Sequence, residues 1–187
     1  MSHFAIHTVD TAPAASKDNV QAIQKSYGML PNLVASFSGS SAALQAYVDL
    51  ESAWNATSFR PANKQLLLVA VSIDNGCTYC TAAHSAMAKM SGAKDDVLNA
   101  VRSGLPTGDD RLDALLAYAR TVNHNRGRTS IGALDAFIAA GFTETQALEV
   151  AVGVAFKALT NTLHAITEVA LDAPFQGFAW QPAPEAK

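Results

Sequence analysis

Apolar residues recur at helical spacing along this sequence, and glycine or proline bounds most of the stretches that carry them. Between residues 40 and 55, the apolar side chains that share one helical face are Leu44, Tyr47, Val48, Leu50 and Trp54. A strongly apolar helix is expected over residues 62–73, because Pro61 stands where the first turn of a helix tolerates proline. Strand signals are weak throughout. The sequence therefore predicts an all-α fold.

The same periodicity predicts the other helices. They should cover residues 17–25, 77–90, 111–123, 131–140 and 143 to about 170. Gly92 and Gly141 follow two of these helices as C-terminal stops, and Thr143-Glu144-Thr145-Gln146 offers a capping start to the last one. The segment 27–32 should be rich in turns, and the proline-containing tail should be extended.

The composition limits the classes of partner. With 187 residues, of which 49% are hydrophobic and 16% charged, the chain can bury the core of one compact domain. A net charge of -3 and scattered basic residues argue against nucleic acid as a partner. The amino terminus lacks the pattern of a secretory signal, and the longest apolar run, Leu66–Val71, is too short to span a bilayer. We therefore expect a cytoplasmic protein with no membrane partner, and its many apolar helical faces favour a homo-oligomer.

Two parts of the sequence echo each other. The run QLLLVAV that begins at Gln65 matches QALEVAV at Gln146, and ALQAY at Ala43 matches ALLAY at Ala114. The order of helix, loop and long apolar helix thus occurs twice. Chance similarity in a chain rich in alanine and leucine is the alternative explanation.

If the duplication is real, the single domain consists of a cysteine-bearing half over residues 27–100 and a cysteine-free half over 101–173. Ala158 and Asn161 occupy the positions in the second half that match the cysteines. One site per chain is therefore expected.

The two cysteines of the chain stand three residues apart, in the segment Cys77-Thr78-Tyr79-Cys80-Thr81-Ala82-Ala83-His84. In a reducing compartment, such a close pair is typical of redox chemistry or metal binding. At about 100° per residue, Cys77, Cys80 and His84 share one helical face. Gly76 allows a sharp turn before the helix, so Cys77 is expected at or near the N-cap. Free N–H groups at a helix start stabilise a thiolate.

Three interpretations of this motif stay open. It can be a dithiol–disulfide site, a metal site, or a structural feature made of two buried cysteines and a core histidine. A closed zinc site needs four ligands, and the sequence holds no second cysteine pair, so we expect no metal. The glycine at the helix start and the histidine four residues after Cys80 favour the dithiol site.

The segment Asn75-Gly76-Cys77-x-Tyr79-Cys80-x-Ala82-Ala83-His84, preceded by the helix of residues 65–73, resembles the alkylhydroperoxidase D and carboxymuconolactone decarboxylase-like family. Gly28-x-Leu30-Pro31-Asn32 is also similar to that family, so the resemblance covers about residues 27–170. It implies an all-helical, AhpD-like fold, often trimeric or hexameric, and a peroxidase that uses no haem, flavin or other cofactor. It also implies a dithiol electron donor such as a lipoylated protein. True decarboxylases of the family usually lack the cysteine pair.

Two positions depart from the family pattern. That pattern has a glutamate of a proton relay twelve residues before the first cysteine, where Gln65 can hydrogen-bond but cannot take a proton. Tyr79 stands where the alkylhydroperoxidase has a histidine. The possible relay residues are therefore Gln65, Asp74 and Tyr79, although a surface role for Asp74 is equally open. Glu51 and Glu149, on neighbouring predicted helices, could also supply the acid.

The predicted function is a thiol-dependent peroxidase of the alkyl hydroperoxide reductase type. His84 takes the proton of Cys80, directly or through water, and the thiolate attacks a hydroperoxide to give a sulfenic acid. Cys77 resolves it to a disulfide, which an external dithiol reduces. Proximity to His84 favours Cys80 as the attacking thiol, whereas the helix-start position favours Cys77, so the assignment stays open. The alternatives are a non-redox enzyme of the same fold acting on a small lactone or acid, and an oligomeric scaffold without catalysis.

Overall fold

Helices account for all the regular secondary structure of residues 3–182, which are the residues that the computed structural model describes. In chain order they are α1 (Ala14–Tyr27), α2 (Asn32–Phe37), α3 (Ser41–Asn55), α4 (Pro61–Asp74), α5 (Thr78–Met90), α6 (Asp95–Ser103), α7 (Asp110–His124), α8 (Ile131–Ala139), α9 (Glu144–Thr167) and the 3₁₀ helix η1 (Ala173–Phe178). The all-α prediction is confirmed.

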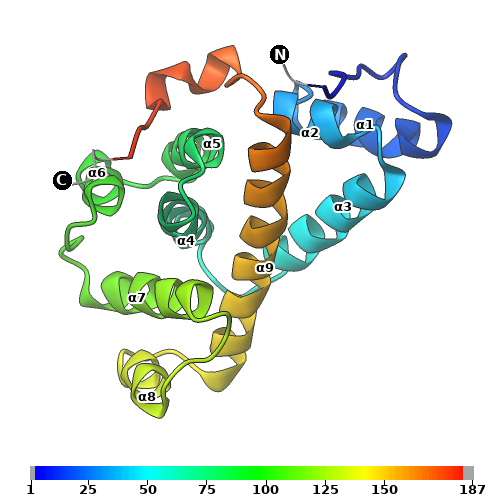
Figure 1. Ribbon diagram of the computed structural model, residues 1–187. Helices are drawn as coiled ribbons and strands as arrows, with labels where there is room; N and C mark the ends of the chain where they lie inside the picture. Colours follow the sequence, from blue (N-terminus) through cyan, green and yellow to red (C-terminus); the bar gives the residue numbers. More distant parts are fainter. Residues whose placement is uncertain (1–2, 183–187) are drawn as a thin grey trace.

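The longest helix, α9, runs through the middle of the molecule and packs against α3, α4 and α7 (Figure 1). A capping box fixes its start, as the sequence predicts. The Thr143 side chain accepts a hydrogen bond from the Gln146 N–H, and the Gln146 side chain accepts one from the Thr143 N–H. By length and composition alone α9 could cross a membrane, a test that core helices of other proteins also pass.

Helices α4 and α5 form a closely packed pair that is joined by a short turn (Figure 1). The turn occurs at Asn75-Gly76, where Gly76 has a φ of 67° in the left-handed region that favours glycine. Every residue of α4 from Leu66 to Ser72 is buried. The pair therefore holds the start of α5 rigidly inside the fold.

The two similar sequence runs that begin at Gln65 and Gln146 both lie near the start of a helix, the first in α4 and the second in α9. Where α4 gives way to α5, however, α9 continues without a break, and Lys157 occupies the position that matches Gly76. The internal duplication itself stays a prediction.

All the helices expected from periodicity are present within a few residues of their predicted bounds, whereas α2, α6 and η1 were not expected. Helices α2 and η1 have six residues each, which is too few turns to show a periodic pattern. Helix α6 has nine residues and carries Val97, Leu98 and Val101 at helical spacing, a pattern that was available in the sequence. The prediction of an extended tail is wrong for residues 173–178, because Pro174 is tolerated in the first turn of η1.

Helix α9 approaches α3 closely at Gly153. A Cβ atom at this position would lie 2.7 Å from the ring of Trp54 and 3.1 Å from the side chain of Leu67. The buried Trp54 indole therefore packs against bare helix backbone. This contact sets the separation of α3 and α9 beside the cysteine-bearing helix.

After α9 the chain returns across α5 (Figure 1). Asp172 accepts hydrogen bonds from the backbone N–H of Asn32, at 3.0 Å, and from the hydroxyl of Tyr79. The Arg102 guanidinium donates a hydrogen bond to the carbonyl of Phe178 at 2.9 Å. These bonds hold η1 over the helix that carries the cysteines.

Candidate active site

The cysteine pair lies at the start of α5. Cys77 is the N-cap residue, and its sulfur accepts a hydrogen bond from the backbone N–H of Cys80, with an N···S distance of 3.3 Å. Both cysteines are buried, free thiols. The sequence prediction of a helix that begins beside Gly76 with Cys77 at its N-cap is confirmed.

The surroundings make the two thiols unequal. Burial alone would raise the pKa of Cys80, but the hydrogen bond from the Cys77 thiol and the charge of Lys157 lower that pKa to about 5, helped by a hydrogen bond from Asn161 and by the nearby His164. The hydrogen bond to Cys80, together with burial, raises the pKa of the Cys77 thiol. The site therefore favours a thiolate at Cys80 and a protonated thiol at Cys77.

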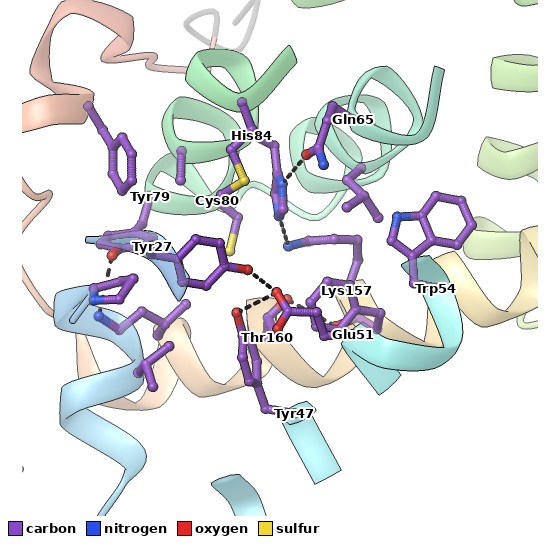
Figure 2. Close-up of a pocket in the computed structure, with 18 of the residues that line it drawn as sticks. Tyr27, Tyr47, Glu51, Trp54, Gln65, Tyr79, Cys80, His84, Lys157 and Thr160 are labelled. Atoms are coloured by element: carbon purple, nitrogen blue, oxygen red, sulfur yellow. Dashed lines mark hydrogen bonds between the residues drawn. The ribbon is translucent and has the colours of Figure 1, made fainter. Parts of the chain in front are cut away.

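His84 is buried between polar side chains from two other helices (Figure 2). Its Nδ1 lies 2.9 Å from Oε1 of Gln65, and its Nε2 lies 2.8 Å from Nζ of Lys157. An ammonium group can only donate, so Nε2 is the acceptor and the ring proton on Nδ1 is donated to Gln65. Burial and the charge of Lys157 lower the pKa of His84.

The imidazole is therefore neutral, and its basic nitrogen is already occupied. The expected role of His84 as the base for Cys80, directly or through water, stays a prediction, and it would require Nε2 to give up its hydrogen bond with Lys157. The structure brings Cys80 and His84 to one site, but it aims the basic nitrogen of the ring at Lys157.

Lys157 lies in the middle of α9 and is only 1% exposed. Among residues 3–182, His84 is the one hydrogen-bond partner of its ammonium group, and no carboxylate forms an ion pair with it. A buried charge is costly unless an opposite charge lies nearby. The charge of Lys157 is among the causes that lower the pKa of Cys80, which lines the same cavity.

A cavity of about 610 Å³ opens beside these groups, a size typical of small-molecule sites (Figure 2). Most of its lining is apolar or aromatic and includes Met29, Tyr47, Trp54, Leu68, Met87, Phe156 and Phe175. Cys80, His84 and Lys157 also line the cavity, whereas Cys77 does not. A small molecule that enters therefore meets Cys80, with Cys77 behind it.

Glu51 faces the same cavity from α3 (Figure 2). Tyr27 and Tyr47 both donate hydroxyl hydrogen bonds to its carboxylate, at 3.0 Å in the case of Tyr47. Burial, followed by the charge of Glu51, raises the pKa of both phenols. The two tyrosines therefore remain protonated and hold the carboxylate in place.

The other candidate acids lie away from the cavity. The Asp74 carboxylate lies 3.2 Å from Nε2 of His124 and 3.7 Å from Nε of Arg120. Glu149 accepts hydrogen bonds from the backbone and hydroxyl of Ser58. Neither acid lines the cavity, so the structure does not bring Asp74 into a relay with the cysteines.

Tyr79 lines the cavity, but its hydroxyl is directed elsewhere. It donates to Asp172 and accepts from the backbone N–H of Leu33 at 3.3 Å, while its ring lies against His164 with centroids 5.3 Å apart. This hydroxyl anchors the tail rather than the sulfurs. Of the three predicted relay residues, Gln65 is the one that contacts His84.

Lys157 is the site residue that sequence reasoning missed. It is the only Asp, Glu, Lys or Arg between Glu149 and Glu168, and a lone charge in an apolar helix was the available signal. Asn161 and His164, four and seven residues further on, share its helical face. Periodicity can place these residues on one face, but it cannot show that this face meets α5.

Among residues 3–182, no three His, Cys, Asp or Glu side chains are grouped in a way that could hold a metal ion. The metal interpretation of the cysteine motif thus lacks a ligand set in this part of the chain.

Residues 41–121 match the model of the Carboxymuconolactone decarboxylase family. No curated protein matches the sequence. The family model spans α3 to α6 and most of α7, and therefore includes both cysteines and His84.

Several solved structures share the fold. A peroxidase-related protein from Ralstonia eutropha JMP134, described as an alkylhydroperoxidase AhpD core, has a TM-score of 0.83 and 21% identity over 97% of this chain and 98% of that chain. A peroxidase-related protein from Silicibacter sp. TM1040 has a TM-score of 0.79 and 18% identity over 94% of each chain. The debrominase Bmp8, as a cysteine-to-alanine variant with 2,3,4-tribromopyrrole, has a TM-score of 0.79 and 16% identity over 95% of this chain and 97% of that chain. The predicted AhpD-like fold is confirmed.

Proposed function

We propose that this chain, which belongs to the alkylhydroperoxidase D and carboxymuconolactone decarboxylase-like family, is a thiol-dependent peroxidase that reduces organic hydroperoxides. The observation that carries the proposal is the position of Cys80. Its sulfur is favoured as a thiolate and borders an apolar cavity, and the thiol of Cys77 is hydrogen-bonded to it on the far side. A reactive thiolate with a resolving thiol in contact is the arrangement that two-electron peroxide reduction needs.

The reaction has two steps on the protein. The Cys80 thiolate attacks the hydroperoxide, so an S–O bond forms, the O–O bond breaks and the alcohol leaves after taking up a proton. Cys77 then attacks the sulfenic sulfur of Cys80, which forms the disulfide and releases water. An external dithiol returns two electrons by thiol–disulfide exchange. In sum, hydroperoxide and dithiol become alcohol, water and disulfide.

The burial of both sulfurs restricts the electron donor. Cys77 is 5% and Cys80 is 2% exposed, so a folded protein surface cannot reach them directly. A slender dithiol such as a lipoyl group can enter through the cavity. We propose such a donor, carried by a partner protein in the cytoplasm, together with the trimeric or hexameric assembly that the family resemblance implies.

The test is consumption of cumene hydroperoxide with dihydrolipoamide as the electron donor. The wild type should turn over repeatedly, Cys77→Ser should turn over more slowly because the donor must reduce the Cys80 sulfenic acid directly, and Cys80→Ser should be inactive. A wild type that consumes no hydroperoxide, or a fully active Cys80→Ser variant, would contradict the proposal. Turnover of a lactone by the Cys77→Ser/Cys80→Ser double variant would instead support the non-redox alternative.

A second candidate is reductive dehalogenation, which is favoured by the aromatic lining of the cavity and by the fold shared with a debrominase. The same dithiol would replace carbon-bound bromine by hydrogen, giving bromide and the Cys77–Cys80 disulfide. Release of bromide from a brominated pyrrole in the presence of dihydrolipoamide would favour this candidate over the peroxidase.

A further inference from the structure

We propose that Lys157 is the charge partner of the Cys80 thiolate and the proton donor to the departing oxygen, and that His84 and Gln65 are its positioning residues. The charge pairing is inferred from the burial of Lys157, from its contact with His84 and from the cavity that it lines together with Cys80. The proton transfer rests on the proposed peroxidase function.

The contacts of Lys157 leave it free for this role. An ammonium group has three N–H donors, and one of them is used by Nε2 of His84 at 2.8 Å. The other two have no protein acceptor among residues 3–182, and the side chain lines the cavity that Cys80 also lines. They are therefore available to the thiolate and to an oxygen atom of a bound substrate.

The role of His84 follows from its two hydrogen bonds. Gln65 accepts the Nδ1–H, which fixes the tautomer, and the lone pair on Nε2 then points at Lys157. The imidazole thus aims the ammonium group without carrying a charge itself. Its pKa is lowered by burial and by Lys157, which keeps the ring neutral.

The contact between His84 and Lys157 explains why a glutamine, and not the glutamate of the family pattern, stands at position 65. A glutamate there would favour a protonated imidazole, and a second cation would then lie 2.8 Å from the Lys157 ammonium. A neutral glutamine avoids that repulsion while still orienting the ring. In the family pattern, a glutamate and a histidine relay the proton. In this chain, we assign that proton transfer to Lys157 on α9.

Lys157 regains every proton that it gives up in the catalytic cycle. When the Cys80 thiolate bonds to the distal oxygen and the O–O bond breaks, the proximal oxygen leaves as an alkoxide and takes a proton from the Lys157 ammonium. The neutral amine then accepts the proton of the Cys77 thiol, whose thiolate attacks the sulfenic acid. The hydroxide that departs takes this proton and leaves as water. Reduction by the external dithiol supplies the proton that restores the ammonium.

Several titratable groups face Cys80, and their effects must be separated from that of Lys157. Cys77 lies beside it at the N-cap of α5, and Lys157 and His164 face it from α9. Tyr79 and His84 share its helix, and Glu51 and Tyr27 line the same cavity. Among these groups, Lys157 is the buried cation that contacts His84 and lowers the pKa of Cys80 by its charge.

The first arm of the test measures the rate of Cys80 alkylation by iodoacetamide against pH, with peptide mass spectrometry reporting each cysteine separately. Lys157→Met should shift the midpoint of the Cys80 profile upward by about one to three pH units. Lys17→Met, at an exposed position on α1, is the matched control and should not shift it. An unchanged midpoint in Lys157→Met would overturn the charge pairing. Circular dichroism checks folding, and Lys157→Gln is the second variant if the methionine variant does not fold.

The positioning role of His84 is tested by two variants in the same alkylation measurement. His84→Ala removes the acceptor that aims Lys157 and should produce part of the Lys157→Met shift. His84→Gln retains an acceptor and should restore most of the wild-type midpoint. Equal midpoints for His84→Ala and the wild type would remove the positioning role.

The second arm compares hydroperoxides whose leaving alcohols differ in acidity. Without its acid, Lys157→Met should lose about 100-fold or more in rate with the least acidic leaving alcohol and less with the most acidic one. An equal loss across the series would refute proton donation. A wild type without peroxidase activity would end the proposed function, while the alkylation arm would still decide whether Lys157 pairs with Cys80.

Discussion

The ammonium group of Lys157 lies 2.8 Å from Nε2 of His84, on the opposite side of the ring from Gln65. This contact directs the basic nitrogen of the imidazole at a buried cation. Sequence spacing suggests that the histidine one turn beyond Cys80 is its base. In the folded protein, Nε2 of His84 accepts a hydrogen bond from Lys157. The positive charge near Cys80 is therefore that of Lys157 and not of the histidine.

The first prediction concerns pH. Because the pKa of Cys80 is lowered to about 5, the thiolate is present at neutral pH, and it becomes protonated as the pH falls through that value. The single-turnover rate with cumene hydroperoxide should therefore be nearly constant between about pH 6.5 and 8, and should fall about tenfold per unit below the pKa. Stopped-flow tryptophan fluorescence measures this rate. A rate that rises tenfold per unit from pH 7 to about 8.5, as expected for an unperturbed thiol, would be inconsistent with it.

The second prediction concerns the packing of α3 on α9. Gly153→Ala gains about 1 kcal/mol of helix propensity but places a Cβ 2.7 Å from the Trp54 ring, and such overpacking costs about 1–3 kcal/mol. We expect a net loss in the free energy of unfolding, measured by urea denaturation. Gly177→Ala is the control, because its Cβ would meet no atom within 4 Å, and it should change stability by less than about 0.5 kcal/mol. A stabilised Gly153→Ala variant would contradict this reading of the interface.

The third prediction separates anchoring from proton transfer at Tyr79. Tyr79→Phe removes a hydrogen bond to the buried Asp172 and should lower the free energy of unfolding by about 1–3 kcal/mol, while the Cys80 alkylation midpoint stays unchanged. Tyr118→Phe is the control, because that ring stacks on Phe137 and its hydroxyl forms no hydrogen bond within residues 3–182. An altered midpoint with unaltered stability would make Tyr79 a relay residue instead.

Local features of the site could be predicted from sequence because they depend on neighbours along the chain. Gly76 before Cys77 indicates the helix start, and the helical spacing of Cys80 and His84 places them on one face. The family pattern adds Gln65 as the partner of His84, a contact that the structure contains. These inferences need only the turn chemistry and the geometry of one helix.

The rest depends on tertiary packing. Lys157 is 73 residues away from His84 in the chain, and no local rule states that the α9 face carrying it meets α5. Asp74 is the acid nearest to the cysteines in sequence, yet the end of α4 directs it toward Arg120 and His124. Proximity along the chain thus favoured an acid that lies away from the cavity, whereas Glu51, the candidate from α3, lines it, and the buried cation was missed.

Which sulfur reacts with the hydroperoxide can be identified directly. Each protein is treated with one equivalent of cumene hydroperoxide and with dimedone, and its cysteine peptides are mapped by mass spectrometry. We expect a Cys77–Cys80 disulfide in the wild type, a dimedone adduct on Cys80 in Cys77→Ser, and an unmodified Cys77 in Cys80→Ser. An adduct on Cys77, or unmodified thiols in all three proteins, would contradict the assignment of Cys80 as the attacking thiol.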